Sequence, residues 1–293
     1  MPFILGLVTV QWLGLFLSSV LLIKSDAGFF YEMAVLCSIF VILNLGAKVI
    51  IIALKWLVIG RTRPGRYPLW GSYYFRVWFV ARLIQATTPK FLQMSPLMRV
   101  WIRLLGGKVG KEAVIAEFET GAWDLIDIGE RASTGSKMKL ANVEYTANEM
   151  VIAPVVIGAY AHIGNACVIS GGSTVSEGAE LRDLTCVLPG QIVPAWEVWD
   201  GSPPRKIGMV DRASLPVHPE ASRPKRALLG VGYFAVYTLM LMIGLVPIFP
   251  AFYVLYNLDY LIGGELDYSI AWSQLIFFTW PTAIILILAS MAI

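Results

Sequence analysis

Apolar and polar positions follow two different patterns along this chain of 293 residues. A helix that spans a bilayer needs about 20 apolar residues, because the hydrocarbon core is about 30 Å thick and the backbone must pair its own polar groups there. Four stretches are apolar enough and long enough. They are Met1 to Ile23, Met33 to Leu54, Ala227 to Leu258 and Tyr268 to Ile293. The pattern predicts four transmembrane helices, two on each side of a less apolar middle segment.

In the middle segment, aliphatic residues recur at every sixth position. The series is unbroken through Ile157, Ile163, Ile169, Val175, Leu181, Val187 and Val193. Small residues occupy the fifth place of the early hexads, at Ala161, Cys167, Ser173 and Ala179. A period of six places residues on no single helical face, and the intervening glycines and prolines would break a helix. The period predicts a left-handed parallel β-helix, in which each hexad forms one face of a triangular prism.

The same pattern begins earlier but out of phase. Val109, Ile115 and Ile128 fit it, yet 13 residues separate Ile115 from Ile128 and 29 separate Ile128 from Ile157. Each interruption must leave the prism as a bulge or loop. The segment Gly201 to Gly208 reads as the turn that closes the prism.

These patterns divide the chain into five parts. We expect two transmembrane helices in residues 1–59, an amphipathic interfacial segment in 60–106, the β-helix in 107–208, a linker in 209–226 and two transmembrane helices in 227–293. Residues 60–106 interleave aromatic residues with arginines, as in Tyr74-Phe75-Arg76, which suits a helix at lipid headgroups. Packing under the β-helix is the alternative. Nucleic-acid binding is disfavoured, because the arginines of this segment are not accompanied by the sequence pattern of a nucleic-acid-binding fold.

Composition and charge place the chain in a membrane and orient it. Hydrophobic residues make up 57%, charged residues 15%, and the mean hydropathy is +0.68, outside the range of soluble proteins. Basic residues flank the middle segment, whereas the turn from Leu258 to Tyr268 holds acids and no base. The middle segment is therefore expected in the cytoplasm. A cleaved signal peptide is the alternative interpretation of the first run. Three scattered cysteines exclude a disulfide framework and a cysteine metal site.

Two longer stretches, read with the hexads, resemble a known family. They are Arg63-Pro64-Gly65-Arg66-Tyr67-Pro68-Leu69-Trp70-Gly71-Ser72-Tyr73-Tyr74 and Arg99-Val100-Trp101-Ile102-Arg103-Leu104-Leu105-Gly106-Gly107-Lys108-Val109-Gly110. With Ile157-Gly158 through Gly164-Asn165, they are similar to the membrane-embedded C-terminal region of the ε-poly-lysine synthetase family of nonribosomal peptide synthetases. The hexads and the closing turn resemble the hexapeptide-repeat acyltransferase superfamily more broadly.

The resemblance, over roughly residues 60 to 208, implies acyl transfer from a phosphopantetheine thioester, carried by a carrier protein or by coenzyme A, to an amine, with amide or peptide bond formation. It also implies an integral protein of the bacterial inner membrane. The chain shows one β-helix where the family region has several, and neither an adenylation nor a carrier domain. A separate adenylation or carrier protein is therefore an expected partner. Soluble members of the superfamily are commonly trimers, so a homo-oligomer is a further expectation.

Aminolysis of a thioester needs a base for the amine and donors for the developing oxyanion. His162 precedes inward-pointing Ile163, so its ring should point off the prism, and it is a candidate base with a solvated surface position as the alternative. An acidic cluster at the first slip in register is the second candidate, as a loop that could hold a cationic amine and accept its proton. Its members are Glu117, Glu119, Asp124 and Asp127; ordinary solvent-facing charge is the alternative.

The remaining candidates would bind the donor or line the second loop. Arg205 and Lys206 follow the closing turn and could bind a phosphate, and Asn165 is a weaker candidate for the donor. Glu144 and Tyr145 lie in the second interruption. No metal site is expected. Two other functions stay open: an O-acetyltransferase for a surface glycan or lipid, and a non-catalytic membrane assembly module.

Overall fold

The computed structural model describes residues 28–87, 92–211 and 222–243. The chain divides into two compact units, residues 1–46 with 238–293 and residues 47–237. In the first unit the described residues belong to the beginning of α2 (Phe29–Val58) and the end of α5 (Arg223–Ile243). The β-helix, its arm and the cavity described below lie in the second unit.

Two of the four apolar runs fall on described helices. By length and composition, Phe30–Val58 and Pro224–Ile243 could each cross a membrane. The first covers the whole predicted span from Met33 to Leu54, and the second covers the beginning of the third run. The first and fourth runs, and the rest of the third, lie outside the described residues. Two of the four predicted spans thus coincide, one fully and one in part, with helices of sufficient length and apolar composition, and their place in a membrane stays a prediction.

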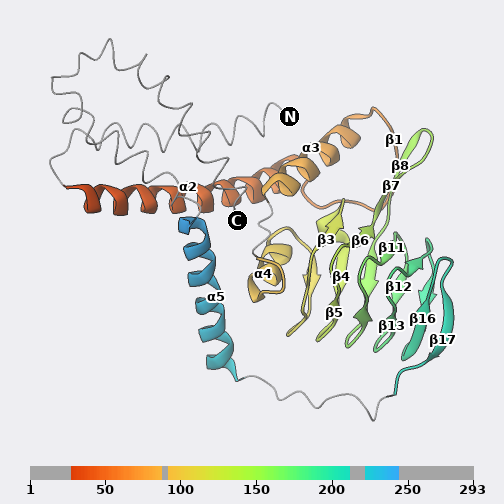
Figure 1. The fold of residues 1–293 in the computed structure, drawn as a ribbon. Helices are drawn as coiled ribbons and strands as arrows, with labels where there is room; N and C mark the ends of the chain where they lie inside the picture. Colours follow the sequence, from red (N-terminus) through yellow and green to blue (C-terminus); the bar gives the residue numbers. More distant parts are fainter. Residues whose placement is uncertain (1–27, 88–91, 212–221, 244–293) are drawn as a thin grey trace, which may run out of the picture. The chain divides into compact units, whose positions relative to one another are not determined.

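The middle of the chain forms a three-sided parallel β-helix (Figure 1). We number its sheets as three faces. The first face contains β2 (Lys108–Val109), β4 (Ile126–Ile128), β9 (Val155–Ile157), β12 (Thr174–Val175) and β15 (Ile192–Val193). The second contains β5 (Ser133–Thr134), β10 (His162–Ile163), β13 (Glu180–Leu181) and β16 (Glu197–Asp200), with β17 (Arg205–Met209) added antiparallel. The third contains β3 (Phe118–Thr120), β6 (Met138–Ala141), β11 (Val168–Ser170) and β14 (Cys186–Val187).

The hexad residues fill the interior of this prism, which confirms the predicted repeat. All seven aliphatic positions from Ile157 to Val193 are at most 1% exposed. Partners on neighbouring coils, such as Ile157 with Val175 and Ile163 with Leu181, stand 18 residues apart in the sequence, which is three hexads per coil. The left-handed sense of the winding stays a prediction from the six-residue period.

Corner glycines allow the coils to stack closely. A Cβ atom built on Gly129 would lie 2.3 Å from the backbone nitrogen of Ala159 on the next coil, so only glycine fits there. Gly158 meets the backbone of Glu177 in the same way at 2.6 Å. The glycines of the repeat are therefore a packing requirement between coils.

The second interruption leaves the prism as an arm. After β6 the chain forms the hairpin of β7 (Val143–Tyr145) and β8 (Glu149–Ile152), and β1 (Gly65–Pro68) adds to it as a third antiparallel strand. The arm packs on α3 (Ser72–Thr87) through a buried cluster of Val77, Ala122, Met150 and Ile152. The extra residues between Ile128 and Ile157 thus form a projection from one coil.

Within the segment 60–106, one helix packs onto the β-helix. Helix α4 (Pro96–Leu104) buries Met98, Trp101 and Ile102 and contacts β2 and the 3-10 turn η2 (Trp123–Leu125). One face of α4 therefore packs against protein, and the interfacial position of residues 60–106 stays a prediction. The prism begins at β2 and ends at β17.

Candidate functional site

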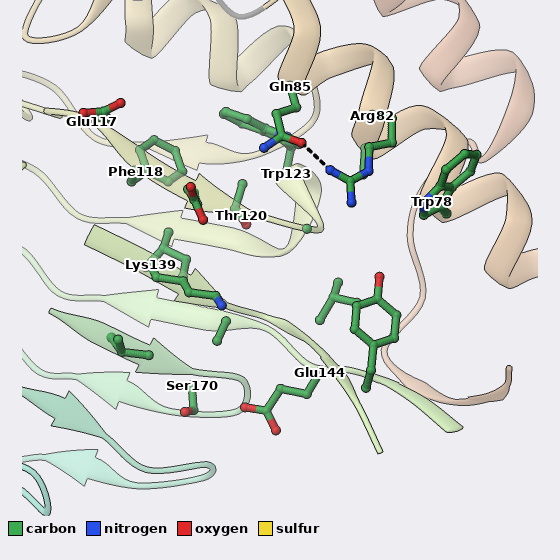
Figure 2. Close-up of a pocket in the computed structure, with 18 of the residues that line it drawn as sticks. Trp78, Arg82, Gln85, Glu117, Phe118, Thr120, Trp123, Lys139, Glu144 and Ser170 are labelled. Atoms are coloured by element: carbon green, nitrogen blue, oxygen red, sulfur yellow. Dashed lines mark hydrogen bonds between the residues drawn. The ribbon is translucent and has the colours of Figure 1, made fainter. Parts of the chain in front are cut away.

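A cavity of about 840 Å³ lies between α3 and the third face of the β-helix (Figure 2). It is lined by side chains of α3, of β3 with its flanking residues, of β6, of the arm and of β11. These are Trp78, Ala81, Arg82, Gln85, Gln93, Glu117, Phe118, Glu119, Thr120, Gly121, Trp123, Lys139, Leu140, Ala141, Val143, Glu144, Tyr145, Val168 and Ser170. Its volume falls within the range of about 300–1,000 Å³ that is usual for ligand pockets.

The cavity carries charges of both signs. Carboxylates come from Glu117 and Glu119 at β3 and from Glu144 on the arm. Positive charges come from Lys139 on β6, which is the register partner of Glu119, and from Arg82 on α3. A ligand with an ammonium group and an anionic group can therefore meet side chains of opposite charge within one cavity.

A side-chain hydrogen bond on α3 orients one of the two cations that line the cavity. The Arg82 Nη1 atom donates to Gln85 Oε1 over 2.9 Å, one helical turn further along α3 (Figure 2). The pair leaves other guanidinium N–H groups available for a ligand, since a guanidinium has five donors. A carboxylate or phosphate is the ligand that such a fork binds best.

Aromatic side chains form the apolar part of the wall. Phe118 and Trp123 pack with ring centroids 5.3 Å apart, and Tyr145 meets Tyr74 of α3 edge to face at 6.0 Å. Burial raises the pKa of the Tyr145 phenol above its ordinary value. The Tyr74 and Tyr145 contact joins α3 to the arm at the edge of the cavity.

Asp124 lies elsewhere, in a buried ion pair. Its Oδ2 atom is 3.2 Å from Lys55 Nζ at the end of α2, with side chains 5% and 3% exposed. The same oxygen accepts the backbone N–H of Thr62, and Lys55 also donates to the Gly60 carbonyl and lies 3.8 Å from the Trp56 ring centroid. The structure therefore gives Asp124 the position of a tether between α2 and the β-helix rather than a place in the cavity.

The other predicted residues lie on different faces. Asp127, on the first face, is 3.7 Å from Lys108 and half exposed. His162, on the second face, shares a 2.8 Å hydrogen bond with Ser133 Oγ through Nδ1. Neither residue lines the cavity.

The predicted donor-binding residues are engaged in contacts within the β-helix. Asn165 sits at a corner, where Oδ1 accepts the backbone N–H of Ser136 and the Asn165 backbone N–H donates to Asp183. Lys206, on β17, pairs with Glu197 at 2.6 Å, and Arg205 beside it is exposed. Within one chain, the three predicted donor-binding residues therefore lie apart from the cavity that Glu117 and Glu119 line.

Sequence reasoning thus located part of the cavity and missed the rest. Glu117, Glu119, Glu144 and Tyr145 were candidates and do line it. Arg82, Gln85 and Lys139 were missed. The hexad period could have placed Lys139 on an outward position, but the 29-residue step to Ile157 hid its alignment with the later coils. Among the described residues, no cluster of three or more histidines, cysteines or acids could hold a metal ion.

No model of a protein family matches the chain. The chain is 29% identical over 231 residues to a delta-poly-L-ornithine synthetase of Acinetobacter baumannii (strain AB307-0294). The match covers 78% of this chain and 17% of that relative, so the chain spans less than a fifth of the protein it resembles.

Solved structures similar to this one include acetyltransferases. A galactoside acetyltransferase in complex with coenzyme A has a TM-score of 0.38 at 16% identity, covering 54% of this chain and 95% of its own. A maltose O-acetyltransferase from Clostridium difficile 630 has a TM-score of 0.34 at 14% identity, covering 58% and 89%. Such scores carry no argument about activity. Over most of its length, this chain is similar to one segment of a poly-amino-acid synthetase.

Proposed function

We propose that this protein is a membrane-bound acyl or aminoacyl transferase that joins a thioester donor to an amine by an amide bond. The similarity to a synthetase supports an enzyme of the acyltransferase type. The cavity on the third face is the observation that carries the proposal, because three carboxylates and two cations line it. We propose phosphopantetheine, bound to a carrier protein or to coenzyme A, as the thiol of the donor.

The acceptor that fits this cavity is a free amino acid with a second amine. Its carboxylate would bind Arg82 or Lys139, and its ammonium groups would bind Glu119 and Glu144. A ligand bound at both ends is held with a defined orientation, which is what a reaction between two substrates requires. The volume of the cavity leaves space beside such an acceptor for the end of a thioester arm.

The reaction needs two proton losses from the amine and one displacement. Glu119, as general base, takes the first proton from the attacking ammonium, and the neutral nitrogen attacks the thioester carbonyl. As the C–N bond forms and the C–S bond breaks, the nitrogen loses its second proton; one of the two protons converts the leaving thiolate into the thiol, and the other passes to solvent. Lys139, the register partner of Glu119, would stabilise the negative charge that develops on the carbonyl oxygen, and Arg82 would then bind the carboxylate of the acceptor.

We further propose that the β-helix faces the cytoplasm beneath an inner membrane. The two apolar helices α2 and α5 support anchoring in a bilayer. The basic residues that follow α2 and begin α5 support this orientation, because such residues accumulate on the cytoplasmic side. His162 and the corner of Asn165 stay candidates for a site shared between copies of the chain.

The proposal is tested with the full chain in lipid nanodiscs, supplied with aminoacyl thioesters of pantetheine or coenzyme A. Ornithine and putrescine are matched acceptors, since putrescine lacks only the carboxylate, and a sugar serves as the hydroxyl acceptor. Mass spectrometry of the amide product gives the rates. Glu119→Gln should lower kcat roughly 100-fold, as loss of a general base does. Arg82→Gln should raise KM for ornithine but not for putrescine.

Glu130→Gln is the matched control, because Glu130 is exposed and does not line the cavity. Its rates should equal those of the unmodified chain. Esters formed with the sugar, and no amides, would assign the chain to O-acyl transfer instead. Absence of both products, with no donor binding, would favour the assembly module.

A further inference from the structure

Two walls of the cavity come from segments that are separate in the sequence. One wall is the turn between β3 and η2, which contributes Thr120 and Gly121, and the other is the beginning of the arm, which contributes Val143 and Glu144. Asn142 lies between β6 and β7, at the point where the arm leaves the prism, and its side chain is only 1% exposed. It is therefore buried directly behind both walls.

The Asn142 amide makes four hydrogen bonds to the turn. Its Oδ1 atom accepts from Thr120 Oγ1 over 3.0 Å, from the Gly121 N–H over 3.1 Å and from the Ala122 N–H over 3.0 Å. Its Nδ2 atom donates to the Ala122 carbonyl over 2.6 Å. Because a backbone N–H can only donate, the two backbone contacts fix which end of the amide is oxygen.

The backbone of Asn142 closes the base of the arm at the same place. Its carbonyl accepts the N–H of Ala153, the residue after β8, over 3.0 Å. A Cβ atom on Gly121 would lie 2.7 Å from the Val143 side chain, so turn and arm are in close contact. One residue thus fixes the turn by its side chain and the arm by its main chain.

We propose that Asn142 is the positioning residue of the cavity: it holds the arm carboxylate of Glu144 at a fixed separation from Glu119 on β3. This inference rests on the proposed function, because the separation matters only if both carboxylates bind one acceptor. Asn142 itself does not line the cavity and is not a catalytic residue. Its role is to keep the distance between two amine-binding groups matched to the length of the acceptor.

The side-chain and main-chain hydrogen bonds of Asn142, which join the turn to the arm, are called the clamp below. They explain why an amide side chain is needed at this position. Leucine, of similar volume, would remove the acceptor of three donors of the turn, and the N–H of Ala122, which is buried, would be left without a partner, which is costly. Aspartate keeps the acceptors but replaces the Nδ2 donor with an oxygen that faces the Ala122 carbonyl. Only asparagine supplies both functions here, since glutamine is longer by one methylene and the site is filled.

The test compares Asn142→Asp and Asn142→Leu with Thr185→Val in the full chain in nanodiscs. Thr185 is a matched control, because it is buried and donates to a backbone carbonyl, that of Arg182, but lies away from the cavity. KM for ornithine should rise at least about tenfold in Asn142→Leu, with a smaller rise in Asn142→Asp. KM for the thioester donor should stay within twofold in both, and Thr185→Val should change neither constant.

Hydrogen exchange supplies a readout that needs no turnover. In Asn142→Leu the amides of residues 120–122 and of the arm should exchange faster together, whereas those of β12 and β15 should not change. Unchanged KM for ornithine in Asn142→Leu, with an active parent chain, would overturn the inference. An inactive parent chain would instead count against the proposed function, and independent exchange of turn and arm in the variant would then overturn the clamp by itself.

Discussion

The buried ion pair between Lys55 and Asp124 gives a quantitative prediction about how α2 is joined to the β-helix. Removal of one partner leaves the other charge in a site where side chains are 3% and 5% exposed. Such losses typically cost about 3–5 kcal/mol of unfolding free energy. Lys55→Met should fall in this range, because Asp124 Oδ1 has no hydrogen-bond partner and its carboxylate would then retain only the Thr62 N–H.

Asp124→Asn should cost less than Lys55→Met, at the lower end of that range. The new amide oxygen can still accept the Thr62 N–H, and the Lys55 ammonium keeps the Gly60 carbonyl and the Trp56 ring. The double variant carries no buried charge. It should therefore be at least as stable as Lys55→Met alone, so the coupling energy is at least the cost of Asp124→Asn, about 3 kcal/mol.

The assay is a double-mutant cycle on the full chain in detergent micelles, with denaturant unfolding followed by tryptophan fluorescence. Arg66 and Glu149 are the control pair, because they are 3.7 Å apart but 76% and 48% exposed. Their coupling should stay below about 1 kcal/mol. Additive effects of Lys55→Met and Asp124→Asn, with no coupling beyond that of the control pair, would refute the tether.

Three further predictions follow from the described contacts. Gly129→Ala should destabilise the β-helix by about 1–3 kcal/mol in thermal unfolding, since its Cβ would overlap the next coil, whereas Gly208→Ala, with open space around it, should stay within about 0.5 kcal/mol. Maleimide should label partly exposed Cys186 and spare Cys167, because Cys167 is fully buried and burial raises the pKa of its thiol. A hydrogen bond from Lys206 lowers the pKa of Glu197 in the folded protein. The contribution of this pair to stability is therefore present above the pKa of Glu197 in the unfolded chain and should be lost as the pH falls through its pKa in the folded protein. Unfolding measured as a function of acid pH checks this.

The β-helix could be predicted because its signal is local and repeated. Each coil uses three hexads, so one aliphatic residue in six must point inward whatever the rest of the chain does. The same logic predicted that the 29-residue step from Ile128 to Ile157 leaves the prism, and it does so as the β7–β8 arm. The form of the arm could not be predicted, because its third strand, β1, comes from residues far earlier in the chain.

The positions of the acidic residues in space could not be predicted from the sequence. Glu119, Asp124 and Asp127 lie within nine residues of one another, yet they occupy the cavity, a buried ion pair and an exposed position on the first face. In a β-helix each short strand points in a new direction, so neighbours in the sequence separate in space. The partner of Asp124 lies 69 residues away, beyond the reach of any local pattern.

The sequence by itself determined the two regular features of this protein, the apolar helices and the coiled hexads, because both depend on the spacing of side chains along a single segment. Only the tertiary structure decided the cavity. Arg82 of α3, Lys139 of β6 and Glu144 of the arm meet there because the arm packs on α3 and the coils stack in register. Such contacts depend on the complementarity of distant surfaces, which no period in the sequence encodes.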